Sequence, residues 1–314
     1  MGEPGAGAPL EAVAAVDVGG TRVKAALVDR AGVEVVAATE ATPTGLGRPG
    51  ALVGAVESTL SRLVGAAAQR GYAVRLGGCG VVVPGVVDDA RGAAVWSANL
   101  GWRDVDVVGP LEQRLGLPVA LGHDVRAGLL AEARLGAARG AENVMFVPLG
   151  TGIAGALMVD GRVLQGGGYA GELGHMEVEP EGPVCGCGAR GCLEAVSSAA
   201  AIERSYAARL GLPEPVTAER VAALVAAGDP DAAAVWGHAV DALGRALVMA
   251  VTLTGVERVL VGGGLSRSGD VLLEPLRRAV SGRLTFQRPP SVELAALGDR
   301  AGCLGAACLA WDLL

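Results

Sequence analysis

Apolar runs that end in glycine turns form the clearest pattern in this chain. Residues 13–18 and 22–29 are apolar runs on either side of Gly-Gly-Thr, and residues 33–39 form a third run. This pattern predicts a strand, a tight turn and two further strands. Residues 144–160 repeat the pattern around Gly-Thr-Gly, with a short strand expected near residues 162–164. The repetition predicts a duplicated unit with a ligand between its two copies.

The other apolar segments alternate between strand and helix patterns. Strands are expected at residues 80–83, where Pro84-Gly85 stops the strand, and at 117–121, 257–261 and 291–294. Helices are expected at residues 48–70, 124–135, 197–210, 217–227, 229–254, 269–281 and 299–314. Such alternation is typical of an α/β fold. The strand at 257–261 runs into three consecutive glycines. Three glycine turns after three apolar strands suit a nucleotide gripped between two lobes.

The composition narrows the class of protein. A chain of 314 residues with 51% hydrophobic and 19% charged residues suits two domains in one compact body. Aromatic residues make up only 3%, so platforms on which bases could stack are scarce. The net charge is −7, and no block of basic residues stands out. A nucleic-acid partner is therefore not expected.

The sequence predicts neither export nor a membrane partner. Residues 1–10 lack a basic segment, and the apolar run that follows contains two acidic residues, unlike a signal peptide. The longest apolar helical run, residues 246–253, is too short to span a bilayer. Cys79, Cys303 and Cys308 stand singly in apolar surroundings, as buried thiols do. These features predict a cytoplasmic enzyme.

The first glycine turn has groups that suit a phosphate. Gly19 and Gly20 allow backbone N–H groups to approach a phosphate closely, and Thr21 adds a hydroxyl. Asp17, at the end of the first strand, has the ligand type that holds Mg²⁺, usually through water. A plain β-hairpin turn has the same residues. The chain has no Gly-x-x-x-x-Gly-Lys-Ser/Thr segment, so the turn is not a P-loop.

The stretch from residue 166 to residue 194 concentrates metal-ligand chemistry. Cys185, Cys187 and Cys192 are separated by glycines, which let the chain fold tightly enough to bring three sulfurs to one centre. With His175 they form the Cys3His set of a closed, structural zinc site. The alternative is a glycine-rich loop that holds a disulfide or free thiols.

Glu172 and Glu194 flank this cluster. A loop pinned by a metal would hold both carboxylates rigidly toward a ligand with several hydroxyls. The alternative is that both are ordinary solvated charges. The spacing alone does not decide between the two.

The same stretch resembles a known family. Gly-Glu-x-Gly-His followed by Cys-Gly-Cys-Gly-x-x-Gly-Cys-x-Glu closely resembles the signature of the ROK family, which holds bacterial sugar kinases and sugar-responsive repressors. The resemblance covers nearly all of the chain from Val13 onward. It implies an actin-like ATPase (RNase H-like) fold with a nucleotide and sugar cleft between two lobes. The small lobe would comprise residues 1–121 plus 298–314, and the large lobe, with the zinc loop, residues 122–297.

The resemblance also implies an activity, that of a bacterial glucokinase. The reaction would be ATP-dependent phosphorylation of a hexose at its 6-hydroxyl, foremost glucose, with ATP, Mg²⁺ and structural Zn²⁺ as cofactors. Asp124 follows a strand and precedes a helix, which is where the family has its catalytic base. By position alone, an aspartate there is commonly a helix N-cap. Such proteins are usually homodimers or homotetramers.

The resemblance implies two further sets of site residues. The sugar ligands would be Gly85, Asn99, His123, Asp124, Glu172, His175 and Glu194. The nucleotide side would comprise Asp17 through Mg²⁺, and Gly19, Gly20, Thr21, Thr151, Gly152, Gly262, Gly263 and Gly264. By its position alone, Asn99 is equally a turn residue. One nitrogen of His175 would bind zinc while the other faces the sugar.

The chain departs from the family next to the expected base. The usual pattern Asn-Asp-x-Asn-Ala is here His123-Asp124-Val125-Arg126-Ala127. Imidazole is bulkier than the amide that binds sugar in the family, and Arg126 replaces a small neutral side chain with a fixed charge. Either change would narrow the pocket, move the sugar or favour a different one.

Three other functions stay open. The substrate would be N-acetylmannosamine, N-acetylglucosamine, fructose or allose instead of glucose, or the protein would be a sugar-binding regulator with impaired catalysis. A sugar-responsive repressor of the same family would carry an N-terminal helix-turn-helix, but only about a dozen residues precede the first strand. The retained Asp124 favours the kinase.

Overall fold

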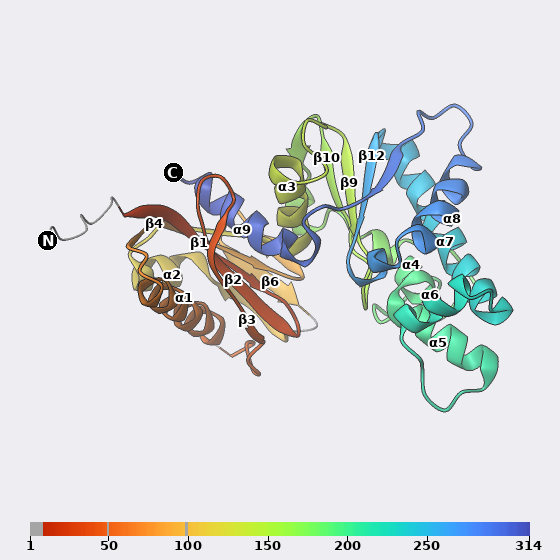
Figure 1. The fold of residues 1–314 in the computed structure, drawn as a ribbon, viewed down its shortest axis with the longest axis horizontal. Helices are drawn as coiled ribbons and strands as arrows, with labels where there is room; N and C mark the ends of the chain where they lie inside the picture. Colours follow the sequence, from red (N-terminus) through yellow and green to blue (C-terminus); the bar gives the residue numbers. More distant parts are fainter. Residues whose placement is uncertain (1–8, 49, 98–99) are drawn as a thin grey trace, which may run out of the picture. The chain divides into compact units, whose positions relative to one another are not determined.

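The protein folds into two compact units. The computed structural model describes residues 9–48, 50–97 and 100–314. Unit 1 contains Met1–Ala131, Gln165–Tyr169 and Arg300–Leu314, and unit 2 contains Glu132–Leu164 and Ala170–Asp299 (Figure 1). Each unit has its own five-stranded sheet with helices packed on it. The expected α/β fold class is confirmed.

The sheet of unit 1 has the strand order β3-β2-β1-β4-β8. The strands are β1 (Leu10–Val18), β2 (Arg22–Val28), β3 (Glu34–Ala41), β4 (Val74–Val83) and β8 (Val119–His123). β1 pairs antiparallel with β2 and parallel with β4, and β4 pairs parallel with β8. Residues 12–16 of β1 are fully buried, as expected of a strand that is covered on both faces.

Helices cover both faces of this sheet. α1 (Ala51–Gln69) and α2 (Val108–Leu115) share one core with the strands on one face. α9 (Ala301–Trp311) packs against β1 and β4 on the other, so the end of the chain, blue in Figure 1, lies beside its red beginning. The approach is close because the facing residues are small: a side chain at Gly80 would collide with the carbonyl of Ala306.

A three-stranded antiparallel sheet in unit 1 was not expected. It contains β5 (Val86–Asp88), β6 (Ala93–Ser97) and β7 (Trp102–Asp106). The strand expected from residue 80 does stop at Pro84-Gly85, where Gly85 has a left-handed φ of 97° and separates β4 from β5. At Gly85 a side chain would also collide with the carbonyl of Trp96. The chain therefore changes direction at a position that requires glycine.

The sheet of unit 2 has the equivalent order, β11-β10-β9-β12-β13. Its strands are β9 (Val144–Pro148), β10 (Ala156–Val159), β11 (Arg162–Val163), β12 (Arg258–Gly262) and β13 (Ser291–Leu294). The first three are antiparallel, and β12 pairs parallel with both β9 and β13. In both units, three meandering strands are followed by two parallel ones. The predicted duplication is confirmed at the level of topology.

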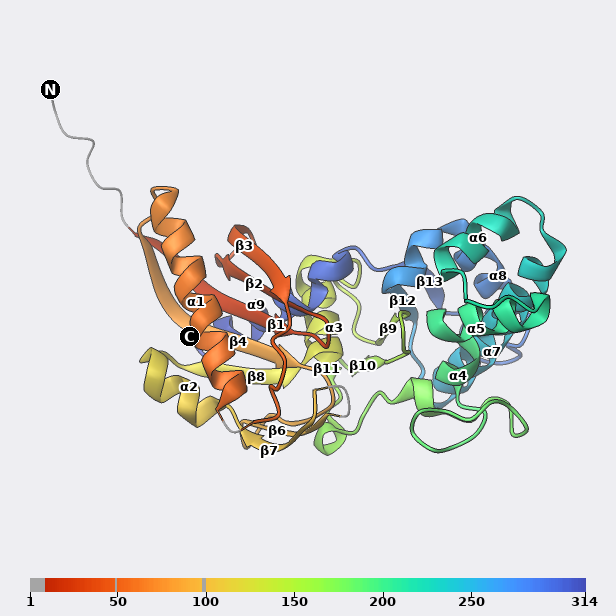
Figure 2. The same cartoon turned by 90° about the horizontal axis from the view of Figure 1, so that it is seen from below.

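The helices of unit 2 gather around a central one, α7 (Pro230–Thr254), as Figure 2 shows. The others are α4 (Leu193–Ser197), α5 (Ala199–Leu210), α6 (Ala218–Ala226) and α8 (Asp270–Ser281), with short 3-10 turns η2 (Leu173–His175) and η3 (Gly264–Ser268). The helix expected over residues 197–210 is α5, which begins two residues later because the extended backbone and hydroxyl of Ser198 cap it.

Within the described residues, two helices are long and apolar enough, by length and composition alone, to cross a bilayer: α1 and α7. The most apolar window of α7 is 61% buried within the protein, and that of α1 is 39% buried. Core helices of globular proteins pass the same test, so this is weak evidence for a membrane span. The apolar run at 246–253 belongs to the much longer helix α7.

Helix α3 (Asp124–Leu135) carries the chain from unit 1 into unit 2. The division falls after Ala131, whereas a boundary at residue 121 was expected. The first half of α3 packs tightly on α9, since a side chain at Gly305 would collide with the carbonyl of Ala127. Gln165–Tyr169, which contains the 3-10 turn η1 (Gly166–Gly168), also belongs to unit 1.

Candidate active site

The turn between β1 and β2 in unit 1 is held in place by hydrogen bonds. The Gly19 amide donates to the carbonyl of Arg22 at 3.0 Å, and the Thr42 hydroxyl donates to the carbonyl of Gly19 at 2.6 Å. Gly20 and Thr21 lie exposed at the tip. The three predicted phosphate-turn residues thus form a preformed turn in which Gly20 and Thr21 are exposed, whereas the Gly19 amide is bonded within the turn.

Asp17 stands at the end of β1, below this turn. Its Oδ2 lies where a side chain at Gly302 of α9 would have to be, 2.6 Å from that Cβ position. The pKa of Asp17 is raised to about 7, foremost by burial and then by the negative charge of Asp124, while Lys24 partly opposes both effects. Two carboxyl groups of unit 1 are therefore close enough to repel each other. A divalent cation beside them would relieve that repulsion.

Asp124 is the first residue of α3, and His123 is the last residue of β8. The Val125 amide donates to Asp124 Oδ1 at 2.7 Å, and His123 Nδ1 lies 3.5 Å from the same oxygen. The Arg126 amide points at His123 Nδ1 at 3.4 Å, so the imidazole caps the helix where the family has asparagine. This arrangement assigns the acceptor to Nδ1 and the proton of a neutral ring to Nε2. Asp124, 27% exposed, is accessible to a ligand.

Two sugar positions of the sequence analysis remain, Gly85 and Asn99. Gly85 lies directly before β5, with the left-handed backbone described above. Asn99 lies outside the residues that the structure describes.

In unit 2, the four predicted metal ligands lie together. Their ligand atoms are all within 4.8 Å of one another. Cys185 Sγ lies 3.7 Å from His175 Nδ1, and Cys187 Sγ lies 3.7 Å from Cys192 Sγ. A tetrahedron with Zn–S bonds of about 2.3 Å has S–S edges of about 3.8 Å, whereas a disulfide needs about 2.05 Å. The donor set and its spacing fit zinc, and the disulfide alternative does not hold for these four residues.

The thiols show why this cluster suits a cation. Burial and the neighbouring thiols raise the pKa of Cys192 to about 12, whereas hydrogen bonds, foremost from the Ala189 amide, lower the pKa of Cys187. Three thiolates cannot accumulate here without a positive charge among them. The loop is fixed by backbone pairing as well: Cys185 N donates to Ala189 O at 2.8 Å, and Val178 N donates to Gly191 O at 2.8 Å.

The metal cluster touches the predicted sugar ligands of unit 2. His175 presents Nδ1 to Cys185, while its Nε2 lies 4.0 Å from Glu172 Oε2. Both side chains are partly exposed. Glu194 Oε2 accepts the Ile153 amide at 2.8 Å and closely approaches Gly152. The structure therefore brings Glu172 and His175 together and sets Glu194 against the β9–β10 turn.

A cavity of about 590 Å³ in unit 2 lies between that turn, η3 and α6. Thr151 and Gly264, both expected on the nucleotide side, line it. Gly263 lies behind it, where its φ of 76° and the carbonyl of Leu149 leave no room for a side chain. Gly262 packs against Phe146. The volume is in the range of small-molecule sites.

Several lining residues of this cavity were not found from the sequence. They are Glu203, Thr217, Glu219, Arg267 and Ser268, from α5, α6 and η3. None of them directly follows a glycine turn. Only Arg267 and Ser268, three or four residues after the glycine run, had a signal in the sequence that would have found them.

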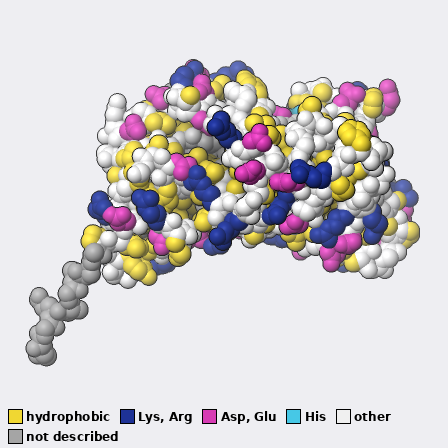
Figure 3. Space-filling model, turned by 90° about the horizontal axis from the view of Figure 1, so that it is seen from above, with side chains coloured by type: hydrophobic (Ala, Val, Ile, Leu, Met, Phe, Trp, Pro, Cys, Tyr) yellow, Lys and Arg dark blue, Asp and Glu magenta, His cyan; other side chains and the backbone are white. Residues whose placement is uncertain are grey.

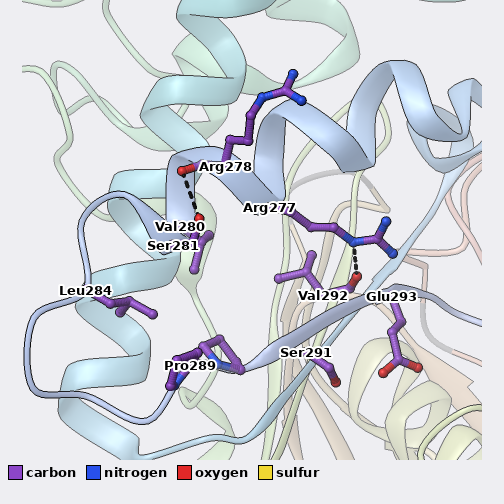
Figure 4. A pocket seen from close by; sticks show the side chains of 10 residues that line it. Arg277, Arg278, Val280, Ser281, Leu284, Pro289, Ser291, Val292 and Glu293 are labelled. Carbon is purple, nitrogen blue, oxygen red and sulfur yellow. Dashed lines mark hydrogen bonds between the residues drawn. The ribbon is translucent and has the colours of Figure 1, made fainter.

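A second cavity of unit 2, about 460 Å³, lies between α8 and β13 (Figure 4). Arg277 Nε donates across it to the carbonyl of Val292 at 2.9 Å, and the Ser281 hydroxyl bonds to Arg278 O at 3.3 Å. The residues that line it, all of them described, include none of the predicted site residues. On the face drawn in Figure 3, basic and acidic side chains are interspersed.

Comparison with known proteins gives this geometry a family. The ROK family profile matches residues 13–312. The chain belongs to the ROK family. It is 38% identical to a glucokinase of Thermotoga maritima over 73% of this chain and 78% of that protein. It is 34% identical to a glucokinase of Halalkalibacterium halodurans over 92% of both.

Solved ROK structures show the fold. A glucokinase from Streptomyces griseus, solved with glucose and AMPPNP, superposes with a TM-score of 0.79 at 29% identity, covering 96% of this chain and 99% of that one. The two equivalent sheets are therefore those of the actin-like ATPase fold. The His175–Cys185–Cys187–Cys192 cluster is consistent with the ROK zinc motif.

Other ROK members have different functions. The chain is 29% identical to a xylose repressor of Bacillus subtilis, over 75% of this chain and 61% of the repressor. It is 32% identical to an N-acetylmannosamine kinase of Citrobacter koseri over 94% of this chain and 97% of that protein. Family membership therefore leaves the substrate open.

Proposed function

We propose that this protein is a cytoplasmic, ATP-dependent sugar kinase that phosphorylates a hexose at its 6-hydroxyl, with glucose as the first candidate. The observation that carries the proposal is the pair of carboxyl groups in unit 1. Asp124 is partly exposed at the start of α3, and its charge reaches Asp17 at the end of β1. A base beside a cation-binding carboxylate is the arrangement that phosphoryl transfer to a hydroxyl requires. The similarity to glucokinases supports the same choice.

In this proposal Asp124 acts on the acceptor. Its carboxylate takes the proton of the sugar hydroxyl as the oxygen attacks the γ-phosphorus of ATP. The new O–P bond forms while the bond from phosphorus to the β,γ-bridging oxygen breaks, and ADP leaves. The Val125 amide fixes one oxygen of Asp124, which leaves the other for the hydroxyl. His123, with its proton on Nε2, donates to a sugar oxygen.

The two turns would hold the phosphates. Gly20 and Thr21, both exposed, offer N–H groups and a hydroxyl, while Gly19 fixes the turn through its bond to Arg22 O. Thr151 and Gly152 offer the same groups in unit 2, and the cavity beside Thr151 and Gly264 takes the adenosine. Magnesium, when bound, neutralises phosphate charge, and Asp17 is the residue that would hold it, through water.

The Cys3His cluster would hold zinc as an architectural ion. His175 would bind it through Nδ1, which leaves Nε2 toward Glu172 and the sugar. Glu172 and Glu194, with Gly85 and Asn99, would bind the remaining sugar hydroxyls. A closed set of four protein ligands leaves no position for a reacting group, so zinc would act by fixing the loop.

A different sugar is the second candidate. It is favoured by one specific observation: His123 fills the cap position with an imidazole where the family has an amide. The ring occupies more of the pocket, and it cannot offer the two donors of an amide. N-acetylmannosamine, N-acetylglucosamine, fructose and allose are the candidates.

The decisive experiment is coupled ADP release with ATP, Mg²⁺ and a panel of hexoses and N-acetylhexosamines. Turnover with glucose supports the glucokinase assignment. Turnover with another sugar keeps the mechanism and changes the substrate. No turnover on any sugar, with zinc bound and the protein folded, would overturn the kinase proposal in favour of a sugar-binding regulator.

A further inference from the structure

Arg126 is a buried charge that the proposed chemistry does not use. It lies in the first turn of α3, two residues after Asp124, and its side chain is 5% exposed. Its Nη1 donates to the carbonyl of Gly168 at 3.2 Å. Nε and Nη2 have no hydrogen-bond partner among the described residues. A buried guanidinium is stable only if a negative group balances its charge.

Asp89, directly after β5, is that negative group. Its Oδ1 lies 3.6 Å from Arg126 Nη2, and its Oδ2 accepts a hydrogen bond from Gln165 Nε2 at 3.0 Å. Burial raises the pKa of Asp89, and Arg126 is the largest effect that opposes the rise. Oδ1, like the two guanidinium nitrogens, has no hydrogen-bond partner within the described chain. Each charge is therefore costly without the other.

Together the two side chains hold both ends of one short segment. Asp89 binds Gln165 at its start, and Arg126 binds Gly168 near its end. The three glycines between, Gly166 to Gly168, all have positive φ, and a side chain at Gly168 would collide with the carbonyl of Val87 in β5. The segment is pressed against β5 in a conformation that needs both glycine and an external anchor.

The segment leads directly into the proposed sugar ligands. Glu172 comes three residues after Tyr169, and His175 comes six residues after it. A chain of three residues spans at most about 11 Å, so the position of Tyr169 limits where Glu172 can lie. We propose that Arg126 and Asp89 act as one positioning pair, which holds residues 165–169 on β5 and so sets where the chain presents Glu172 and His175 to the sugar. The inference rests on the proposed sugar-kinase function for its second half only.

The pair explains the departure from the family pattern. A neutral side chain at position 126 would need no partner, whereas arginine there requires the carboxylate of Asp89. Residues 165–169 are then held by a charge pair. A change in either partner changes the sugar site and leaves the nucleotide turns as they are. Sugar preference is the property that such a pair determines.

The first test needs no substrate. Hydrogen exchange of the amides of residues 166–169 is compared between the parent protein and Arg126→Gln. The amides of Gly168 and Tyr169 bond within the segment, so they report its opening. The matched control is Arg91→Gln, which breaks the exposed Arg91–Asp104 ion pair of the same unit. We expect exchange at 166–169 to rise roughly tenfold or more in Arg126→Gln and to be unchanged in the control.

The second test reads the sugar site. Loss of a positioning contact should raise the KM for the sugar by roughly ten- to a hundredfold, while the KM for ATP changes little. The order of preference across the sugar panel should change as well. The double variant Arg126→Gln/Asp89→Asn removes both charges, so it should recover much of what either single variant loses. If Arg126→Gln does not fold, Arg126→Lys keeps the charge but loses the planar fork, and should show an intermediate effect.

The outcomes distinguish failure of the Arg126–Asp89 pair from failure of the proposed kinase function. Unchanged exchange in Arg126→Gln overturns the pair as an anchor, whatever the protein phosphorylates. Faster exchange with an unchanged sugar KM overturns the positioning role, as does an equal rise in both KM values. If the loss in the double variant equals the sum of the losses in the two single variants, the two side chains do not act as a pair. An inactive parent protein refutes the kinase function, and sugar affinity measured by calorimetry in the same variants then replaces the sugar KM.

Discussion

The two sheets share one topology, but the residues at the turns of their first hairpins, β1–β2 and β9–β10, differ in charge. In unit 1, Asp17 is the second-last residue of β1, two residues before Gly19, and the hydroxyl of Thr42, directly after β3, supports the turn. In unit 2, the residue two before Gly150 is Pro148, and the turn is supported by Glu194 from the far side of the metal loop. In unit 1 the strand before the turn supplies the carboxylate, Asp17, whereas in unit 2 the carboxylate, Glu194, comes from another part of the chain.

This difference indicates how the duplicated scaffold divides its work. The copy with Asp17 also has Asp124 at the start of its helix, so both carboxyl groups to which we assign cation binding and proton transfer lie in unit 1. The neutral copy leaves room beside its turn for a cavity of about 590 Å³ and for the metal loop. Equivalent strands can support both kinds of site, because a parallel strand brings its carboxyl end to the edge of the sheet where ligands bind.

The largest effect is expected from Asp124→Asn. The amide keeps the size of the side chain but cannot take a proton, so turnover should fall by about 10²–10⁴-fold while calorimetry finds sugar binding largely intact. The matched change in unit 2 is Asp270→Asn, at the first residue of α8, which should leave turnover within about twofold. Near-normal turnover in Asp124→Asn would show that Asp124 is not the base, and would contradict the proposed difference in function between the two units.

Loss of the metal should come next. Cys187→Ser removes one of four ligands, so stoichiometric zinc measured by elemental analysis should disappear, and the unfolding free energy should fall by several kcal/mol. The sugar KM should rise because Glu172 and His175 lose their anchor. Chelation of the parent protein should have the same effects. The control is Cys303→Ala, a buried thiol of unit 1, whose zinc content should be unchanged. A parent protein purified without zinc contradicts this prediction.

The carboxylate that distinguishes unit 1 should also cost stability. The pKa of Asp17 rises from 3.8 to about 7 in the folded protein. Between these values the native state binds the proton and the unfolded state does not, so stability falls as pH rises through this window. Asp17→Asn should therefore be more stable than the parent at pH 8 by roughly 1–4 kcal/mol, at about 1.4 kcal/mol per pKa unit, and nearly equal to it at pH 4.

Urea denaturation without magnesium measures this difference. The control is Asp160→Asn, in an exposed turn of unit 2, for which the two stability curves should run parallel. A difference between Asp17→Asn and the parent that does not change with pH would mean that Asp17 is ionised throughout. The copy with proline at the matching position has no such charge to titrate.

The scaffold was largely predictable from the sequence because apolar runs between glycine turns encode it directly. The first three strands, α1 and α7 lie close to their expected bounds. The metal cluster was predictable for a different reason: four ligand residues within 18 positions have few other arrangements. The sheet of β5, β6 and β7 was not predicted, because each of its strands has only three to five residues and its direction changes at Gly85.

The parts of the site that depend on distant contacts could not be predicted. Asp89 carried no local signal, and its pairing with Arg126 exists only because residues 165–169 return to unit 1. The polar lining of the cavity comes from α5, α6 and η3, which are far apart in sequence. Even His123, singled out for its chemistry, gave no indication that its imidazole would cap α3. Patterns within a few residues predict turns and ligand sets, whereas partners follow from topology.

The smallest effects should come from the supports behind the two turns. Thr42→Val removes a neutral hydrogen bond to Gly19 O, worth about 0.5–1.5 kcal/mol, so the KM for ATP should rise only a few-fold. Glu194→Gln replaces a charged acceptor at Ile153 N, where the contribution is about 1.5–3 kcal/mol, and should affect the sugar KM as well. The two single variants and their double should add, since the supports belong to different units. If Thr42→Val were the more damaging change, the first turn rather than the metal loop would be the more critical support for nucleotide binding.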